Sequence, residues 1–218
     1  MKGKRGNPYE HRYREKVEET LTEKEYETYY NNCKDLERLR HEQRTNPQYP
    51  FDLRIVDFKI SGLLAVLYYT GLRISEIVGD EKDGIHGLRK RDLRVEEEYI
   101  RVNAEEVRKH GKREEPLWIP LDKLGVQDIV DQWEDTKDRN DRIFPISCWT
   151  GWSLISEVTE GRLYPHYFRL NRATKFAEHE ETSIKDLQDW FGWVDPRTVG
   201  KYLGKAGKRT KRMAERIA

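Results

Sequence analysis

Residues 70 to 77 read Thr70-Gly71-Leu72-Arg73-Ile74-Ser75-Glu76-Ile77. An apolar run from Ile60 to Tyr69 precedes this stretch, so we expect a buried helix to end at the Thr-Gly pair and a new helix to begin near Arg73. A helix start carries unpaired N–H groups and a partial positive charge, so an arginine placed there can help to hold an anion. An Arg-x-x-Glu pair alone is more typical of a surface ion pair. Residues further along the chain have to decide between the two interpretations.

Further polar and aromatic residues follow near the end of the chain: His166-Tyr167-Phe168-Arg169, then Trp193, then Tyr202. His166 and Arg169 are three residues apart, so both project from one face of a helix. Tyr202 follows Trp193 by nine residues. Together with the Thr-Gly-Leu-Arg block and a Leu-Thr-x-x-Glu segment at residues 21–25, this order and spacing resemble the tyrosine recombinases, the phage-integrase family of DNA strand exchangers.

The resemblance implies six catalytic residues, which are Arg73, Lys112, His166, Arg169, Trp193 and Tyr202. It makes Tyr202 the nucleophile, the two arginines phosphate clamps, and His166 a proton-transfer or phosphate-positioning group. Trp193 departs from the histidine that is commoner at this point, and its indole N–H can donate a hydrogen bond but cannot shuttle a proton. Glu76 stands at the family's acidic position and is expected to orient neighbouring basic groups.

The hairpin lysine has two candidates. In the family this lysine lies on a β-hairpin and protonates the leaving 5′ hydroxyl of DNA as a general acid. Counting back without gaps from residues 119–121 selects Lys112, whereas a hairpin that turns at residues 110–111 selects Lys109. We rank Lys112 first and keep Lys109 as its competitor.

The chemistry implied for Tyr202 explains why two arginines are needed. A tyrosine hydroxyl, with an ordinary pKa near 10, attacks a phosphodiester only if its proton is removed and the developing charge is neutralised. Each guanidinium can donate two parallel hydrogen bonds to the phosphate oxygens and stays charged. The phosphotyrosine intermediate conserves the energy of the broken bond, so resealing needs no ATP. The sequence contains no Walker-type loop and no carboxylate cluster for a metal, so we expect no cofactor.

Each of these residues also has an ordinary structural interpretation. Arg73 and Arg169 can form salt bridges in a chain this charged, and His166 can be a surface or packed histidine. Trp193 can pack in a core beside Trp190 and Phe191. Core packing of Trp193 does not exclude a role at the site.

Composition limits the class of protein. Of 218 residues, 37% are charged and 11% are aromatic, so a packed core is possible and wholesale disorder is not expected. The net charge of +1 argues against a uniformly basic nucleic-acid binder. Basic residues are clustered instead, and we expect phosphate contact from the clusters at residues 89–91 and 205–212.

Cysteine use and hydropathy indicate a cytoplasmic protein. Cys33 and Cys148 are too few and too far apart for a disulfide framework or a zinc site, and they fit a reducing compartment. No apolar run approaches the length of a membrane span, and the N-terminus lacks the pattern of a signal peptide. Duplex DNA is the expected partner.

The expected fold is mainly α with a small antiparallel β-hairpin or three-stranded sheet, the architecture of a tyrosine recombinase catalytic domain. We expect a flexible basic arm over residues 1–20, the catalytic domain over 21–204 and a basic tail over 205–218. Helices are expected over residues 22–45, 52–69, 73–79, 122–133 and 165–179, after the Thr182-Ser183 cap as far as Phe191, and from Asp195-Pro196 through Tyr202. Strands are expected at residues 99–102 and 117–120, paired across a turn at residues 110–111.

The leading function is site-specific recombination, which includes integration and resolution. A type IB topoisomerase, which would relax DNA as a monomer, is one alternative. The other is a non-catalytic DNA-binding regulator with a helix-turn-helix at residues 73–92, although mere binding would not need Tyr202. Few residues precede Leu21, where family members carry a DNA-clamping domain, so the chain is either a short recombinase or a fragment. We expect a monomer in free solution and self-association on paired DNA sites, with Met213 and Ile217 docking on a neighbouring subunit.

Overall fold

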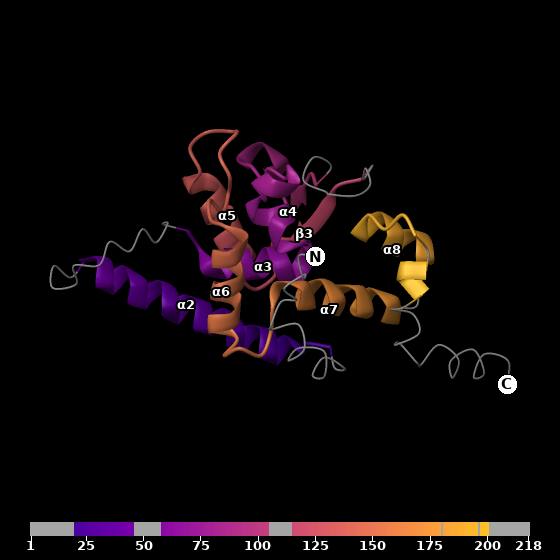
Figure 1. Ribbon diagram of the computed structural model, residues 1–218, viewed down its shortest axis with the longest axis horizontal. Coiled ribbons are helices and arrows are strands. Elements are labelled where there is room, and N and C mark those ends of the chain that lie inside the picture. Colours follow the sequence, from indigo (N-terminus) through magenta and orange to yellow (C-terminus); the bar gives the residue numbers. More distant parts are fainter. Residues whose placement is uncertain (1–19, 46–57, 105–114, 180, 196, 201–218) are drawn as a thin grey trace, which may run out of the picture.

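The computed structural model describes residues 20–45, 58–104, 115–179, 181–195 and 197–200 (Figure 1). The α-helices named in it are α2 (Glu23–Thr45), α3 (Ile60–Thr70), α4 (Ile74–Val78), α5 (Val126–Asp135), α6 (Cys148–Val158), α7 (Pro165–Glu178) and α8 (Ile184–Phe191). Two 3₁₀ turns span Glu81–Asp83 and Lys90–Asp92, and the strands are β1 (Leu93–Val95), β2 (Tyr99–Val102) and β3 (Leu117–Pro120). The expected class, mainly α with a small antiparallel sheet, is confirmed.

Helix α3 forms the centre of the molecule, and Figure 1 shows it surrounded by the other elements. Every one of its residues is buried, which is typical of a helix that is apolar on all sides. It ends at Gly71, whose φ of 64° is left-handed and whose N–H donates to the carbonyl of Leu67. A Cβ on Gly71 would lie 2.9 Å from the ring of Phe191, so only glycine fits this turn. No helix in the described residues is long and apolar enough to cross a membrane.

Helix α2 begins at the Leu-Thr-x-x-Glu segment. The backbone N–H of Thr22 donates to the Glu25 carboxylate at 2.8 Å, and the N–H of Glu25 donates to the Thr22 hydroxyl at 3.2 Å. This reciprocal pair satisfies two N–H groups that the first turn leaves unpaired. The N–H of Leu21 donates to the Asn171 side chain at 2.8 Å and so connects the start of α2 to α7. The helix predicted over residues 22–45 is confirmed.

The small sheet has the order β1-β2-β3, and both pairs are antiparallel. Ile100 pairs with Ile119 and both are buried, whereas Tyr99 and Trp118 are exposed on the outer face. The apolar–polar alternation that predicted strands at residues 99–102 and 117–120 is confirmed. The turn between them, with Lys109 and Lys112, lies outside the described residues.

Three expectations about helices need correction, the first being that α5 spans Val126–Asp135 and so begins four residues after the start predicted at residue 122. Helix α3 begins at Ile60, since Lys59 before it has an extended backbone (φ −77°, ψ 108°). The helix predicted from residue 52 therefore starts too early. Residues 52–57 themselves lie outside the described residues. Helix α6 was not predicted, because Thr150, Gly151 and Ser153 give its sequence a weak helical preference. The Ser147 hydroxyl caps it by accepting from the N–H of Thr150 at 3.0 Å, and Gly151 allows it to pack closely on Ile74 of α4.

The helix-turn-helix expected for a non-catalytic regulator is also wrong. Within residues 73–92, which are all described, α4 has five residues and no second α-helix follows it. The chain instead closes a tight loop, in which the N–H of Asp80 donates to the Ile85 carbonyl and the N–H of Ile85 to the Asp80 carbonyl. This loop leaves no helix that a DNA groove would accept as a recognition element.

Helix α8 packs on a small core of its own. Figure 1 shows it beside the C-terminal part of α7, away from α2 and α5. The buried members of this core are Ala173, Leu187, Phe191, Trp193 and Val199. Ser183 caps α8 as predicted, since its hydroxyl accepts from the N–H of Asp186. The helix expected after Asp195 is seen over residues 197–200, and Tyr202 lies outside the described residues.

Candidate functional site

Arg73 is held at the start of α4 by a buried carboxylate. Its backbone N–H donates to Glu76 Oε2 at 2.8 Å, and its Nη1 donates to Glu76 Oε1 at 2.7 Å. The Glu76 side chain is only 1% exposed, whereas the Arg73 side chain is 36% exposed. Glu76 therefore fixes the guanidinium of Arg73 while leaving part of it open to solvent.

Arg169 lies near the same carboxylate as Arg73 and is enclosed by protein. Its Nη1 donates to the Gly71 carbonyl at 2.9 Å and its Nη2 to the Phe191 carbonyl at 2.6 Å. Its Nη1 is also 3.9 Å from Glu76 Oε2, so one carboxylate serves both arginines. With 1% of its side chain exposed, Arg169 joins the end of α3 to α8. Protein also covers its remaining N–H groups, so a ligand can reach the guanidinium only if the residues around it move.

Trp193 and Phe191 cover the guanidinium of Arg169. The guanidinium carbon is 5.0 Å from the ring centre of Phe191 and 5.6 Å from that of Trp193. The two rings stack with their centres 4.7 Å apart. Such contacts are worth about 0.5–2 kcal/mol each. The two interpretations of Trp193 are thus compatible, because it packs in the small core and also contacts an expected site residue.

His166 lies in the first turn of α7, in the electrostatic field of both arginines. It is exposed to solvent on one side, yet protein surrounds much of the imidazole. Incomplete hydration, followed by the positive charges of Arg169 and Arg73, lowers its pKa, and Glu76 opposes the effect. At neutral pH the imidazole is therefore unprotonated and able to accept a proton.

The structure thus brings four of the six predicted site residues together: Arg73, His166, Arg169 and Trp193. The other two, Lys112 and Tyr202, lie outside the described residues, as does Lys109. Among the described residues, Arg73 and Arg169 share the carboxylate of Glu76, so these three side chains together carry a positive charge. A half-exposed guanidinium beside a neutral imidazole can hold an oxyanion and accept a proton.

Sequence reasoning missed two residues that shape this cluster. Trp190 is expected from the sequence only to pack in a core. Its indole N–H in fact donates to the Thr70 carbonyl at 2.9 Å and so fixes α8 on the end of α3. Arg172 was not singled out, although its position three residues after Arg169 predicts that both lie on one face of α7. The density of aromatic residues at 190–193 was the signal for the first.

The basic cluster at residues 89–91 has a structural role that sequence reasoning did not predict. The ammonium of Lys90 donates to the carbonyls of Glu134 and Thr136, at and just beyond the C-terminus of α5. It also lies 5.2 Å from the ring centre of Trp133, and Arg91 donates to Asn140 at 2.8 Å. Lys90 therefore caps α5, and the phosphate contact expected of this cluster stays a prediction.

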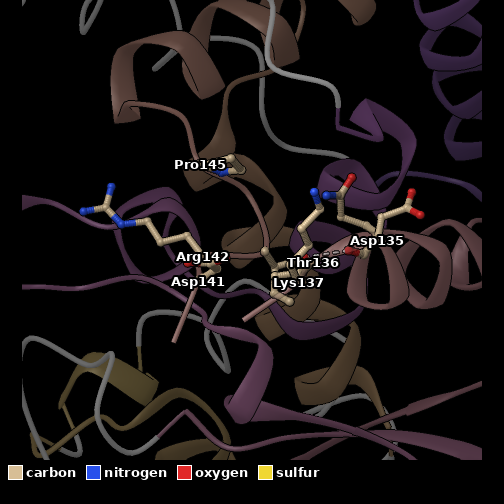
Figure 2. Close-up of a pocket in the computed structure, with 8 residues that line it drawn as sticks. Asp135, Thr136, Lys137, Asp141, Arg142 and Pro145 are labelled. Carbon is tan, nitrogen blue, oxygen red and sulfur yellow. Dashed lines mark hydrogen bonds between the residues drawn. The ribbon is translucent and has the colours of Figure 1, made fainter. Parts of the chain in front are cut away.

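A separate hollow of about 480 Å³ lies at the C-terminal end of α5. Figure 2 shows Asp135 and Lys137 on one side of it, with Arg142 extending on the other. Its charges are mixed, and Arg142 is 3.6 Å from Glu81. None of the four predicted catalytic residues that the structure describes lines this hollow, so it is distinct from the cluster around Glu76.

Comparison with known proteins identifies the family and the fold. The model of the phage integrase family matches residues 19–209. A solved structure titled as that of XerA recombinase superimposes with a TM-score of 0.56 at 16% identity, over 89% of this chain and 65% of that one. At this identity the likeness shows the fold, and the chain spans 65% of the length of that structure. No curated protein matches significantly. Because the family model covers most of the chain, the protein belongs to the phage integrase family.

Proposed function

We propose that this protein is a site-specific DNA recombinase or integrase that cuts and rejoins duplex DNA through a 3′-phosphotyrosine intermediate, without metal or ATP. The observation that carries the proposal is the convergence of Arg73, His166 and Arg169 around the single buried carboxylate of Glu76. Here a fixed cation keeps a solvent face beside an unprotonated imidazole, as phosphoryl transfer requires.

Each residue has one role in the proposed reaction. The Tyr202 oxygen forms a bond to phosphorus while the bond from phosphorus to the 5′ oxygen breaks. The tyrosine proton passes to His166, and Lys112, or Lys109 in its place, gives a proton to the leaving 5′ oxygen. Rejoining is the reverse of these steps, with a 5′ hydroxyl as the attacking group.

The arginines stabilise the charge that develops on the phosphate. Arg73 donates from its exposed side, and Glu76 keeps it in place before DNA arrives. Arg169 adds its remaining donors when the residues that enclose its guanidinium move aside, while its contacts with the Gly71 and Phe191 carbonyls can remain. Trp193 keeps the guanidinium oriented and offers an indole N–H to the phosphate.

We further propose that the protein is monomeric in free solution and assembles on paired DNA sites. The basic tail at residues 205–218 would supply phosphate contacts and the Met213/Ile217 stripe that docks on a neighbouring subunit. Support for this comes from sequence alone, since the tail lies outside the described residues. Sedimentation of the full chain and of a chain ending at Gly204, each with and without DNA, tests it. A stable multimer without DNA would contradict it.

The deciding experiment for the activity is covalent trapping. Wild type and Tyr202→Phe are incubated with a pool of nicked duplexes whose sequence around the nick is randomised, and adducts are resolved in SDS. We expect an adduct from wild type only, with equal DNA binding by both proteins. An adduct from Tyr202→Phe would exclude Tyr202 as the nucleophile, and no adduct from wild type would exclude the activity. Recombinant joints between two duplexes, as opposed to relaxation of one plasmid, distinguish a recombinase from a topoisomerase.

A further inference from the structure

Arg172 is a half-buried cation that the proposed reaction does not use. It follows Arg169 by one turn of α7, and its guanidinium carbon lies 4.4 Å from the ring centre of Phe176 and 5.6 Å from that of Trp190. Its Nε is enclosed and has no hydrogen-bond partner. Among the described residues, no carboxylate pairs with it, whereas Arg169 has Glu76 and two carbonyls.

This arrangement has a cost in free energy. Removing a charged group from water is unfavourable unless ion pairs and hydrogen bonds replace the lost hydration. Burial lowers the pKa of Arg172, and Tyr68 and Tyr69 offset this only in part. Contacts with two aromatic faces replace part of the hydration but satisfy no N–H group. An anionic ligand would satisfy what the protein leaves unpaired.

Arg172 also lies beside the cluster around Glu76. A Cβ placed on Gly71 would be 3.3 Å from the Cβ of Arg172 and 3.4 Å from the Cα of Arg169, so both arginines pack against the turn that leads to Arg73. Lys175, one turn further along α7, donates to the Tyr68 hydroxyl at 3.0 Å. Three cations therefore follow one another on the face of α7 that meets the end of α3 and α8.

We propose that Arg172 binds a second phosphate of the DNA strand, next to the one held by Arg73 and Arg169. Phe176 and Trp190 hold the plane of its guanidinium, and the phosphate binds its terminal N–H groups, because the enclosed Nε is out of reach. The inference rests on the proposed function only in naming DNA as the source of the phosphate. Arg172 contributes affinity, and the cleavage step itself does not depend on it.

The test is the salt dependence of DNA binding. Arg172→Met keeps the alkyl stem and removes the charge, and Arg38→Met removes an exposed cation on α2, whose side chain is 63% exposed. Binding of a labelled duplex is measured over a series of salt concentrations. We expect Arg172→Met to reduce the log–log slope by about 0.9, the share of one phosphate contact. Arg172→Lys should restore most of the slope, and Arg38→Met should leave it unchanged.

Three results would overturn the inference. An unchanged slope with a lower melting temperature makes Arg172 a packing residue only. An equal loss of slope in Arg38→Met makes the effect one of net charge. A lower cleavage rate at saturating DNA with an unchanged slope makes it a positioning residue. If Arg172→Met does not fold, the salt dependence of DNA binding is measured with Arg172→Gln, for which the same change in slope is expected. If Arg172 binds no phosphate, wild type still forms the covalent adduct, so this result and a failure of the proposed cleavage activity can be distinguished.

Discussion

The two ends of helix α3 carry charge clusters of opposite sign. At its N-terminal end, the N–H and hydroxyl of Ser61 both donate to Glu37 at 2.8 Å. Lys34 lies between Glu37 and Asp128, at 3.3 and 3.0 Å, and the Tyr30 hydroxyl donates to Asp128 at 2.8 Å. Two carboxylates face one ammonium, and donors of the protein take up the surplus negative charge.

The C-terminal end has the reverse balance. Arg73 and Arg169 lie around the carboxylate of Glu76, and Arg172 packs beside the turn at Gly71. Both clusters agree with the helix dipole, which favours anions at the N-terminus and cations at the C-terminus by about 0.3–1 kcal/mol each. The two clusters differ in how fully protein groups satisfy their charges. At the C-terminal end, Arg73 keeps a solvent face and Arg172 has no ion pair among the described residues. At the N-terminal end of α3, donors of the protein satisfy the carboxylates, whereas the C-terminal end can still accept an anion.

Glu76→Gln should have the largest effect. It removes the carboxylate that faces both arginines, of which Arg169 is almost fully enclosed by protein. We expect a loss of roughly 3 kcal/mol in the free energy of unfolding, measured by denaturant titration, and a loss of cleavage. Glu157→Gln, which removes a carboxylate that is 55% exposed, is the control and should change little. A Glu76→Gln protein as stable as wild type would mean that the buried charges are balanced by other groups.

Arg73→Lys should affect the reaction without affecting the fold. A lysine keeps the charge but cannot reproduce the paired donors, and loss of such a donor costs about 10²–10³ in rate. Single-turnover adduct formation measures this, and the melting temperature should stay near that of wild type. Arg169→Lys should lower both quantities, since its guanidinium also serves two carbonyls. Near-normal cleavage by either variant would refute the phosphate clamp.

The same comparison shows what sequence could and could not predict. The end of α3, the i,i+3 link from Arg73 to Glu76 and the strands at residues 99–102 and 117–120 follow from local pattern and were predicted. The enclosure of Arg169 was not, because it depends on α8 returning over α7 to place the Phe191 carbonyl on the guanidinium. The cap that Lys90 forms on α5 is likewise a contact between distant segments. Local patterns identify the residues, and long-range packing decides which of them face solvent.

Asp128→Asn tests the closed end of α3. The substitution weakens the hydrogen bonds that Tyr30 and Lys34 donate to Asp128. The Lys34 side chain is 41% exposed, so solvent screening reduces the contribution of that ion pair to stability. We expect a loss of about 1–2 kcal/mol in the free energy of unfolding, and no change in adduct formation per folded molecule. A large loss of cleavage in a folded Asp128→Asn protein would show that the two ends of α3 are coupled, against the division drawn between them.

The smallest effect is expected from His166, and it depends on pH. Because its pKa is lowered in the fold, chiefly by burial and then by Arg169 and Arg73, the unfolded chain binds more protons between the folded pKa and the ordinary value near 6.5. Stability from this group is therefore complete above about pH 6.5 and is lost as the pH falls toward the folded pKa. Its solvent-exposed side keeps the change small.

His166→Gln should remove that pH dependence. Denaturant titrations of both proteins at about pH 7.5 and about pH 5.5 measure it, and the wild type should lose more stability between the two than the variant does. The wild-type rate of adduct formation should hold down to a pH below the ordinary histidine pKa, because the imidazole that receives the tyrosine proton stays unprotonated there. His179→Gln, on the exposed C-terminal side of α7, is the matched control and should follow wild type in both measurements. A wild-type rate that falls at a pH above the ordinary histidine value would assign the proton to another group and leave His166 to position the phosphate.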